Sequence, residues 1–273
     1  MEAYSVLMTV YREEDPQDLA TAIESMLQQT VRTDNFVVVC DGPLTEELDA
    51  VLNGYIVQYG SLFDVVRLPE NVGIGAANRA GLARCKNELV AKMDADDVSV
   101  PQRCEKQLRK FEENSKLAVV GGFIEEFDPD QKEGFAIRKV PADYEQIRRF
   151  ARRRQPFNNT TVMYRRSAVE AVGSYRNMRR CEDYDLYIRL LHAGYYAENL
   201  QEVIVRVKVD GKARSRRASW STLQGCAHSR WRAFRLGYSS LWDVLLCVGG
   251  ECVICICPGF IQQYIYKTFL RQS

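Results

Sequence analysis

Two carboxylates at the end of a mostly apolar run are the residues in this sequence best suited to hold a metal ion. Asp94 and Asp96 follow the segment from Glu88 to Met93, whose apolar run is too short and too abruptly ended for a helix and predicts a buried strand. Side chains two residues apart in an extended chain point to the same side, so both carboxylates can face one ligand. Hard oxygen ligands in this number suit Mg²⁺ or Mn²⁺ that is shared with a diphosphate.

The same stretch also has a purely structural interpretation. Acidic residues often cap a helix that starts with proline, and Pro101 is expected to open the next helix. Asp97 is expected to be such a capping residue and not a metal ligand. Metal binding and helix capping remain alternatives for this cluster as long as these residues are considered alone.

A second acidic cluster, at residues 182–185, opens a segment whose apolar residues recur at helical spacing. Glu182 and Asp183 are therefore expected in the first turn of a helix, where the helix dipole favours negative charge. Asp183 and Asp185 lie about 200° apart around such a helix, so they cannot share one role. Asp185 and Arg189 are four residues apart and are expected to pair on the helix surface.

The first hundred residues alternate between strand-like and helix-like segments, which predicts an α/β fold with a doubly wound, mainly parallel sheet flanked by helices. Strands are expected at Tyr4–Val10, Phe36–Cys40, Phe63–Leu68 and before Asp94, and helices from Pro16, from Leu48 and from about Ala76 to Lys86. Ligands bind at the carboxyl ends of the strands in such sheets. The polar residues expected at these ends are Thr9, Asp41, Asn71 and Asp94.

The later part of the chain is expected to continue the domain and then to form a C-terminal helical appendage. Further strands are expected at Leu117–Phe127, Asn158–Arg166, Tyr195–Asn199 and Val203–Val209, with a short helix at Ser167–Gly173. Lys208–Arg217 is a basic linker, Trp220–Tyr238 has a basic amphipathic pattern, and Leu241–Ile261 is apolar but interrupted. A membrane-spanning helix would not readily hold its Asp and Glu, so it is expected to lie on a membrane surface or to pack as an ordinary helical pair.

The composition is that of a globular protein. Hydrophobic residues make up 46% and charged residues 27% of the 273 residues, which excludes disordered, coiled-coil and collagen-like designs. The net charge of +1 conceals an acidic half at residues 1–136, with formal charge −12, and a basic half at residues 137–273, with formal charge +13. The acidic half suits a cation and the basic half an anion or an anionic surface. No nucleic-acid recognition module is evident, so nucleic acid is not an expected partner.

Nine cysteines, an odd number, occur in a chain without a recognisable N-terminal signal peptide, which favours a reducing compartment. Cys252, Cys255 and Cys257 have a metal-like spacing but lie in an apolar run without a second pair nearby. We therefore expect apolar thiols there and no zinc site.

These segments together resemble the family 2 glycosyltransferases, which are inverting enzymes with a GT-A fold, and in particular the bacterial members that build capsule, exopolysaccharide or O-antigen repeats. The resemblance runs from Tyr4 to about Gly194. It rests on five motifs in the family's order: Ser5–Tyr11, the turn at Asp41, Asn71-x-Gly73 with Ala77-Asn78, Asp94-Ala95-Asp96-Asp97, and Glu182–Leu186. Each motif is weak alone, but five in order at family-like spacing are specific.

The resemblance implies roles for individual residues. The donor nucleotide, most often UDP, would be lined by Thr9, Tyr11, Glu13, Asp41, Asn71, Gly73 and Asn78. The resemblance also implies that Asp94 and Asp96 position the ribose and the Mn²⁺ or Mg²⁺ on the diphosphate, and that Asp183 is the catalytic base. Structural alternatives remain for three of these residues: an Asx-turn for Asp41, core packing for Tyr11, and a turn before a helix for Gly73. The place of Tyr11 just past a strand end favours stacking on the base, whereas for Gly73 the two interpretations are nearly equal.

Two departures from the family pattern bear on the acceptor. Many members have a histidine where this chain has Asn159, which leaves an acceptor or phosphate contact there open. Processive members carry Gln-x-x-Arg-Trp, whereas Arg230-Trp231 is preceded by Ala227 in place of the glutamine. One sugar per encounter is therefore expected.

The sequence thus predicts an inverting, metal-dependent transfer of a hexose from a UDP-sugar to a saccharide acceptor carried on a lipid diphosphate, in surface polysaccharide biosynthesis. A catalytic domain is expected at residues 1–215, with a nucleotide-binding half at 1–100 and an acceptor half at 101–215, before the helical segment at 216–273. The expected location is the cytoplasm. If the C-terminal segment lies on a membrane surface, the basic half is expected to contact the anionic inner face of the cell membrane. The alternative function is a non-catalytic nucleotide-binding or scaffolding member of a polysaccharide assembly complex.

Overall fold

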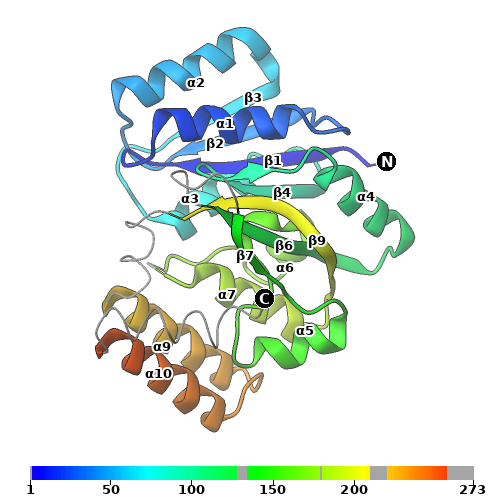
Figure 1. Cartoon of the computed structure of the whole chain (residues 1–273), viewed down its shortest axis with the longest axis vertical. Coiled ribbons are helices and arrows are strands. Elements are labelled where there is room, and N and C mark those ends of the chain that lie inside the picture. The colour runs from blue at the N-terminus through cyan, green and yellow to red at the C-terminus, as the bar shows by residue number, and fades with distance from the viewer. Residues whose placement is uncertain (1, 128–133, 179, 210–219, 257–273) are drawn as a thin grey trace.

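The computed structural model describes residues 2–127, 134–178, 180–209 and 220–256. The strands in this part of the chain form one sheet in the order β3-β2-β1-β4-β8-β6-β9-β5, with β7 paired to β6. Their bounds are β1 Tyr4–Val10, β2 Asn35–Cys40, β3 Phe63–Arg67, β4 Leu89–Asp94, β5 Val98–Ser99, β6 Leu117–Phe127, β7 Gly134–Arg138, β8 Met163–Arg165 and β9 Tyr196–Lys208. Helices cover both faces of this sheet (Figure 1), which confirms the predicted α/β class.

The helices are α1 Pro16–Leu27, α2 Glu46–Tyr59, α3 Ile74–Leu82, α4 Arg103–Glu113, α5 Tyr144–Ala151, α6 Arg166–Ala171, α7 Glu182–His192, α9 Trp220–Arg235 and α10 Leu241–Ile256, with 3₁₀ turns η1 Gly60–Leu62 and η2 Asn159–Thr161. Asp15 caps α1 as expected, because its Oδ1 accepts the N–H of Gln17 at 2.8 Å, and Pro16 is the first helical residue. Pro101, however, does not open α4. That helix begins two residues later, after Gln102, whose side chain makes no capping bond.

The four N-terminal strands are parallel, and their register brings the predicted strand ends together. Thr9 pairs with Asp94 across β1 and β4, and Val10 pairs with Cys40 across β1 and β2, one residue before Asp41. The carboxyl ends of β1, β2 and β4 therefore share one edge of the sheet. All residues of β1 and β2 are buried, and so are those of β4 apart from Asp94, because helices cover both faces of the sheet.

Alternate residues of β1 supply two cores. Val6 and Met8 pack with the apolar faces of α1, α2 and α4, whereas Leu7 packs on the opposite side with Ala77 of α3 and Leu186 of α7. The sheet therefore holds α7, which carries the predicted base Asp183, and α3, which carries Asn78, on the same face.

The second half of the sheet is mixed, and three predicted strands differ from the structure. The segment Asn158–Arg166 is a 3₁₀ turn followed by the short strand β8, because Asn158 and Thr161 turn back to bond Gly122. The strands expected at Tyr195–Asn199 and Val203–Val209 are one strand, β9, which stays paired with β6 through shifts in register.

The C-terminal helices α9 and α10 pack against each other at the end of the molecule opposite α2 (Figure 1), and α9 lies against α7. Within the described ranges, no helix has the length and apolarity needed to cross a membrane. Most of the expected basic linker and the end of the apolar segment, residues 210–219 and 257–273, lie outside the described residues.

Candidate active site

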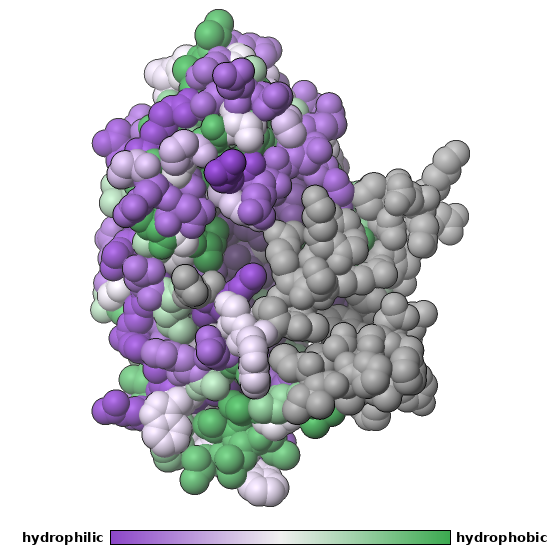
Figure 2. Space-filling view, turned by 90° about the vertical axis from the view of Figure 1, so that its left-hand side faces the viewer, coloured by the Kyte–Doolittle hydropathy of each residue, from purple (hydrophilic) through white to green (hydrophobic). Residues whose placement is uncertain are grey.

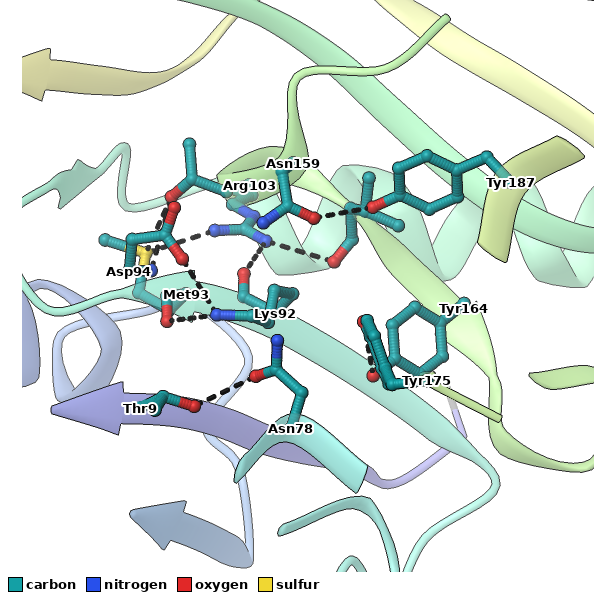
Figure 3. Close-up of polar contacts among 12 residues, drawn as sticks. Thr9, Asn78, Lys92, Met93, Asp94, Arg103, Asn159, Tyr164, Tyr175 and Tyr187 are labelled. Atoms are coloured by element: carbon teal, nitrogen blue, oxygen red, sulfur yellow. Dashed lines mark hydrogen bonds and ion pairs between the residues drawn. The ribbon is translucent and has the colours of Figure 1, made fainter. Parts of the chain in front are cut away.

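The predicted nucleotide side contains a direct contact between β1 and α3. Thr9 Oγ1 donates to Asn78 Oδ1 at 2.9 Å, and both side chains are buried. Asn78 Nδ2 has no hydrogen-bond partner among the described residues, although its residue is fully buried. Figure 3 shows this amide nitrogen directed toward the end of β4, so it is a donor available to a ligand at the strand ends.

Asp41 organises the loop that precedes α3. Its Oδ1 accepts the N–H of Val72 at 2.8 Å and its Oδ2 the N–H of Gly73 at 3.1 Å. Asn71 Nδ2 donates to the Asp41 carbonyl at 3.3 Å. The carboxylate therefore bonds the neighbouring loop and not its own turn. Gly73 has φ +90°, a conformation that favours glycine, and directly precedes α3.

Tyr11 and Glu13 lie in the loop after β1, beside this edge. Tyr11 is partly buried and Glu13 is exposed. Every residue predicted for the donor nucleotide thus lies at or just after the carboxyl end of β1, β2 or β4, or bonds a residue that does.

A lysine that the sequence interpretation had not singled out joins the acidic cluster. Lys92 is fully buried, and its Nζ lies 2.8 Å from Asp94 Oδ1 and 3.2 Å from the Met93 carbonyl (Figure 3). The spacing of two residues on a strand placed both side chains on one side and was the available signal. Asp94 therefore enters the site already paired with a cation.

Arg103 of α4 holds the end of β4 from within the core. Its side chain is fully buried and donates to the Lys92 carbonyl at 2.7 Å, to Met93 Sδ at 3.4 Å and to Gln107 Oε1 at 3.1 Å. Burial lowers the pKa of this guanidinium, whose charge is balanced by the oxygen atoms around it. The first turn of α4 thus fixes the backbone that carries Asp94.

Asp97 is not a helix cap, contrary to the prediction. It is 3% exposed, its carboxyl group bonds Thr160 and the backbone N–H of Lys208, and α4 starts elsewhere. Burial, followed by the charges of Asp96 and Asp94, raises its pKa well above the ordinary value. Chain folding brings β9 against this turn and buries a residue that looked like a surface cap.

The strand-end carboxylates suit a divalent cation whose coordination is completed by a ligand. Asp94 and Asp96 are close enough to raise the pKa of Asp97, so negative charge is crowded at this point. Among the described residues, no group of three or more His, Cys, Asp or Glu side chains can hold a metal by itself. These oxygen donors therefore fit Mg²⁺ or Mn²⁺ shared with a diphosphate and not a closed protein cage.

Asp183 lies in the first turn of α7, after Cys181 in the left-handed conformation with φ +61°. Its Oδ1 accepts the N–H of Tyr184 at 2.7 Å, and its Oδ2 accepts a hydrogen bond from Gln155 Nε2. Burial raises the pKa of Asp183, and the negative charge of Asp94 raises it further. The fold thus brings Asp183 within electrostatic range of the strand-end carboxylates.

Glu182 connects α7 to the nucleotide side. It is buried, and burial together with the charge of Asp183 raises its pKa to about 8. A Cβ atom at Gly75 of α3 would lie 2.2 Å from the Arg176 carbonyl oxygen and 3.3 Å from Glu182 Cβ. Only glycine permits this approach, which joins the start of α3 to the start of α7.

Asp185 does not pair on the surface, as was expected, but inside the protein. Its carboxylate is 2% exposed and lies 2.8 Å from Arg189 Nε, 3.2 Å from Arg176 Nη1 and 3.1 Å from Arg232 Nε. The pairing of Asp185 with Arg189 was predicted correctly. The predicted exposure of this pair was wrong, because α9 covers this side of α7. Three arginines around one carboxylate make it a structural anchor.

Asn159, at the position where the resemblance led us to expect a histidine, lies between α7 and the end of β4. Tyr187 of α7 donates to Asn159 Oδ1 at 2.8 Å (Figure 3). The adjacent Thr160 accepts the backbone N–H of Asp94 at 3.4 Å. The 3₁₀ turn η2 therefore bridges α7 and the end of β4.

Comparison with known proteins gives one consistent result. Residues 5–173 match the family model described as glycosyl transferase family 2. The chain is 35% identical to the amylovoran biosynthesis glycosyltransferase AmsE of Erwinia amylovora, over 81% of this chain and 82% of that protein. It is 29% identical to the Escherichia coli UDP-Gal:alpha-D-GlcNAc-diphosphoundecaprenol beta-1,3-galactosyltransferase, over 98% of this chain and 97% of that protein.

A solved structure shows the same fold. The mannosyltransferase PcManGT from Pyrobaculum calidifontis, in complex with GDP-Man and Mn²⁺, superposes with a TM-score of 0.67, covering 97% of this chain and 79% of that chain at 13% identity. The architecture is therefore the GT-A fold that the sequence motifs predicted.

Proposed function

Because the chain belongs to glycosyl transferase family 2, we propose that it catalyses the inverting transfer of a hexose from a UDP-sugar to a saccharide acceptor carried on a lipid diphosphate. The observation that carries this proposal is the convergence of two acidic groups from distant parts of the chain. Asp94 at the end of β4 lies within electrostatic range of Asp183 at the start of α7. Asp94 suits the diphosphate side of a donor, and Asp183 suits removal of a proton on the acceptor side.

The donor nucleotide is proposed to lie along the edge formed by β1, β2 and α3. Each oxygen of Asp41 accepts one backbone N–H and keeps a further lone pair, which suits the N–H of uracil. In this proposal Tyr11 stacks on the base, and Asn78 Nδ2, which has no hydrogen-bond partner within the described residues, donates to the ligand. The full proposed set is Thr9, Tyr11, Glu13, Asp41, Asn71, Gly73, Asn78 and Asp94.

Asp96 and Asp94 are proposed to hold Mn²⁺ or Mg²⁺ against the diphosphate. When bound, the ion offsets the negative charge that develops on the departing nucleotide. Because Lys92 already neutralises part of the charge of Asp94, we assign the larger share of metal binding to Asp96 and a donor-positioning role to Asp94.

Asp183 is proposed to take the proton from the acceptor hydroxyl as that oxygen attacks the anomeric carbon. The bond from the acceptor oxygen to the anomeric carbon forms, the bond to the diphosphate oxygen breaks, and its electron pair leaves with UDP. Gln155 and the Tyr184 N–H orient the carboxylate for this step. A single displacement inverts the anomeric centre and transfers one sugar per encounter.

The lipid-linked acceptor is inferred from the activity for which the Escherichia coli relative is named, and that relative is similar over nearly the whole chain. The role in polysaccharide biosynthesis is inferred from the similarity to AmsE. Exposed arginines at and after the end of α5 offer cations to the phosphates of such an acceptor; they are Arg148, Arg149, Arg152, Arg153 and Arg154. The proposed place of action is the cytoplasm at the inner face of the cell membrane, with the anionic lipid surface as a further partner.

The test combines binding and transfer on the full-length protein. UDP is titrated calorimetrically with Mn²⁺, with EDTA, and against Asp96→Ala, and transfer from UDP-galactose to a synthetic GlcNAc-diphosphate-lipid is followed in parallel. We expect UDP binding that needs the metal and Asp96, and an Asp183→Asn variant that binds UDP normally but loses transfer at least a hundredfold.

Two results would overturn the proposal. Near-normal transfer by Asp183→Asn would move the base elsewhere. UDP binding without transfer from any UDP-sugar to any lipid-linked saccharide would support the alternative of a nucleotide-binding scaffold in a polysaccharide assembly complex.

A further inference from the structure

Helix α10 turns an apolar face to the solvent. Trp242 is 63% exposed, Leu245 56% and Leu246 44%, and these residues recur at the spacing of one helix face. Leu241 and Val253, which are 48% and 52% exposed, extend the same stripe. Figure 2 shows apolar side chains gathered at the end of the molecule where α9 and α10 lie in Figure 1.

The opposite face of α10 is held inward by a carboxylate. Asp243 is 5% exposed; its Oδ1 lies 2.5 Å from Arg153 Nε, and its Oδ2 accepts the Ser240 N–H at 3.0 Å. Although burial acts to raise it, these bonds hold the pKa of Asp243 at about 2, so the group is ionised. The ion pair fixes the rotation of the helix, and the apolar face cannot turn into the core without breaking it.

Cationic side chains lie on the segment that packs against α10. The end of α5 and the residues after it contact α9, α10 and the turn between them: Arg230 Nη1 donates to the Ala151 carbonyl at 3.4 Å, Tyr238 Oη to the Arg148 carbonyl at 2.9 Å, and Cys247 Sγ to the Arg153 carbonyl at 3.3 Å. The side chains of Arg149, Arg152 and Arg154 in the same segment are exposed. An apolar stripe with tryptophan and flanking arginines has the chemistry of a helix that lies in the interface of an anionic bilayer.

We propose that the exposed face of α10 seats the protein on an anionic lipid surface, with Trp242, Leu245 and Leu246 entering the interface and the nearby arginines contacting lipid phosphates. The inference deepens the proposed function and rests on it for the lipid-linked acceptor. Charge complementarity selects a lipid surface over a second copy of the chain, because apposed copies would bring their arginines together.

The same helical pair is fixed to the helix that carries the proposed base. The Arg230 guanidinium of α9 lies 3.9 Å from the centre of the Tyr184 ring, and Arg232 Nε lies 3.1 Å from Asp185 Oδ1. Binding of the protein to the lipid surface through α10 thus sets the orientation of α7 toward acceptors that emerge from the bilayer.

The experiment is flotation of the full-length protein with two kinds of vesicle. One is made of phosphatidylcholine alone, and the other also contains about 30% phosphatidylglycerol, chosen to match an anionic leaflet. We expect binding to the anionic vesicles that weakens with salt. The variant Trp242→Ser/Leu245→Ser/Leu246→Ser should lose it at least tenfold, and Val57→Ser, at an 87% exposed position on α2, should keep it. UDP binding and transfer to a short-chain, water-soluble acceptor should be the same in all three proteins.

Wild-type protein that stays soluble with every vesicle, or a triple variant that floats like the wild type, would overturn the inference. So would a wild-type dimer in sedimentation that the triple variant dissociates, since the face would then join two copies. Failure of the proposed function is seen separately, as loss of UDP binding or of transfer to the water-soluble acceptor.

Discussion

Lys92 Nζ lies 2.8 Å from Asp94 Oδ1 at the end of β4, where the donor diphosphate is proposed to bind. The lysine side chain is 1% exposed and the aspartate side chain 36%, so the cation is internal and the carboxylate faces the site. A buried ammonium beside a metal-binding carboxylate opposes the metal, because it neutralises the carboxylate and repels the ion.

Replacing Lys92 with Met should therefore tighten the binding of Mn²⁺ together with UDP, by roughly tenfold for about 1.4 kcal/mol of removed repulsion. The apo protein should become less stable, because Asp94 loses its partner near Asp96 and Asp97. Calorimetric titration of Mn²⁺ with UDP measures the first effect. Lys92→Arg, which keeps the charge, and Lys86→Met, at an exposed position, are the controls; equal metal affinity in all four proteins would rule this role out.

Removing the hydrogen bond from Gln155 to Asp183 should weaken catalysis without weakening donor binding. Gln155→Met should lower kcat/KM roughly tenfold to a hundredfold, since a hydrogen bond to a charged group contributes about 1.5–3 kcal/mol. Loss of the donor raises the pKa of the ionised base still further, so the acidic limb of the pH profile should move to higher pH. Gln58→Met, on the exposed face of α2, is the control. An unchanged limb combined with weaker UDP binding would make Gln155 a structural residue.

Glu182 should make the protein less stable as the pH rises. Its pKa is raised from an ordinary 4.5 to about 8, so the folded protein keeps a proton that the unfolded chain releases. Stability from this group is complete below about pH 4.5 and is lost as the pH rises through about 8. Glu182→Gln should flatten this decline, and each pKa unit so recovered corresponds to about 1.4 kcal/mol, or roughly 3–6 °C in Tm for a chain of this size. Thermal unfolding from pH 5 to pH 9 measures it; parallel curves for both proteins would contradict the assignment.

An added methyl group at Gly75 should separate α3 from α7. The new Cβ atom would lie 2.2 Å from a backbone carbonyl oxygen, so Gly75→Ala should cost about 1–3 kcal/mol and weaken UDP binding. Gly54 on α2 has open space around it, and Gly54→Ala should stabilise the protein slightly through helix propensity. Chemical denaturation compares the two variants. A Gly75→Ala protein as stable as Gly54→Ala would mean that the contact is not tight.

Local patterns predicted most of the N-terminal half. The alternation of apolar strands with helical periodicity is enough to place β1 to β4 in a parallel sheet, because parallel strands need crossover helices and the crossovers have one hand. The neighbouring positions of Thr9, Asp41 and Asp94 follow from that topology, and the Thr9–Asn78 contact agrees with it. In the second half Leu117–Phe127 and the helix from Glu182 were predicted correctly, but other strand bounds were wrong, because the sheet is mixed and pairing depends on turns such as the one at Asn158.

The sequence alone determined the family, the fold class and the candidate carboxylates Asp94, Asp96 and Asp183, because residue type and short-range spacing are local properties. Only the tertiary structure decided how those carboxylates are charged and held. Lys92 inside the sheet, Gln155 against Asp183, and α9 over Asp185 depend on contacts between residues distant in the sequence or on their burial. Desolvation and charge pairing are set by every chain segment that surrounds a group, so no local pattern specifies them.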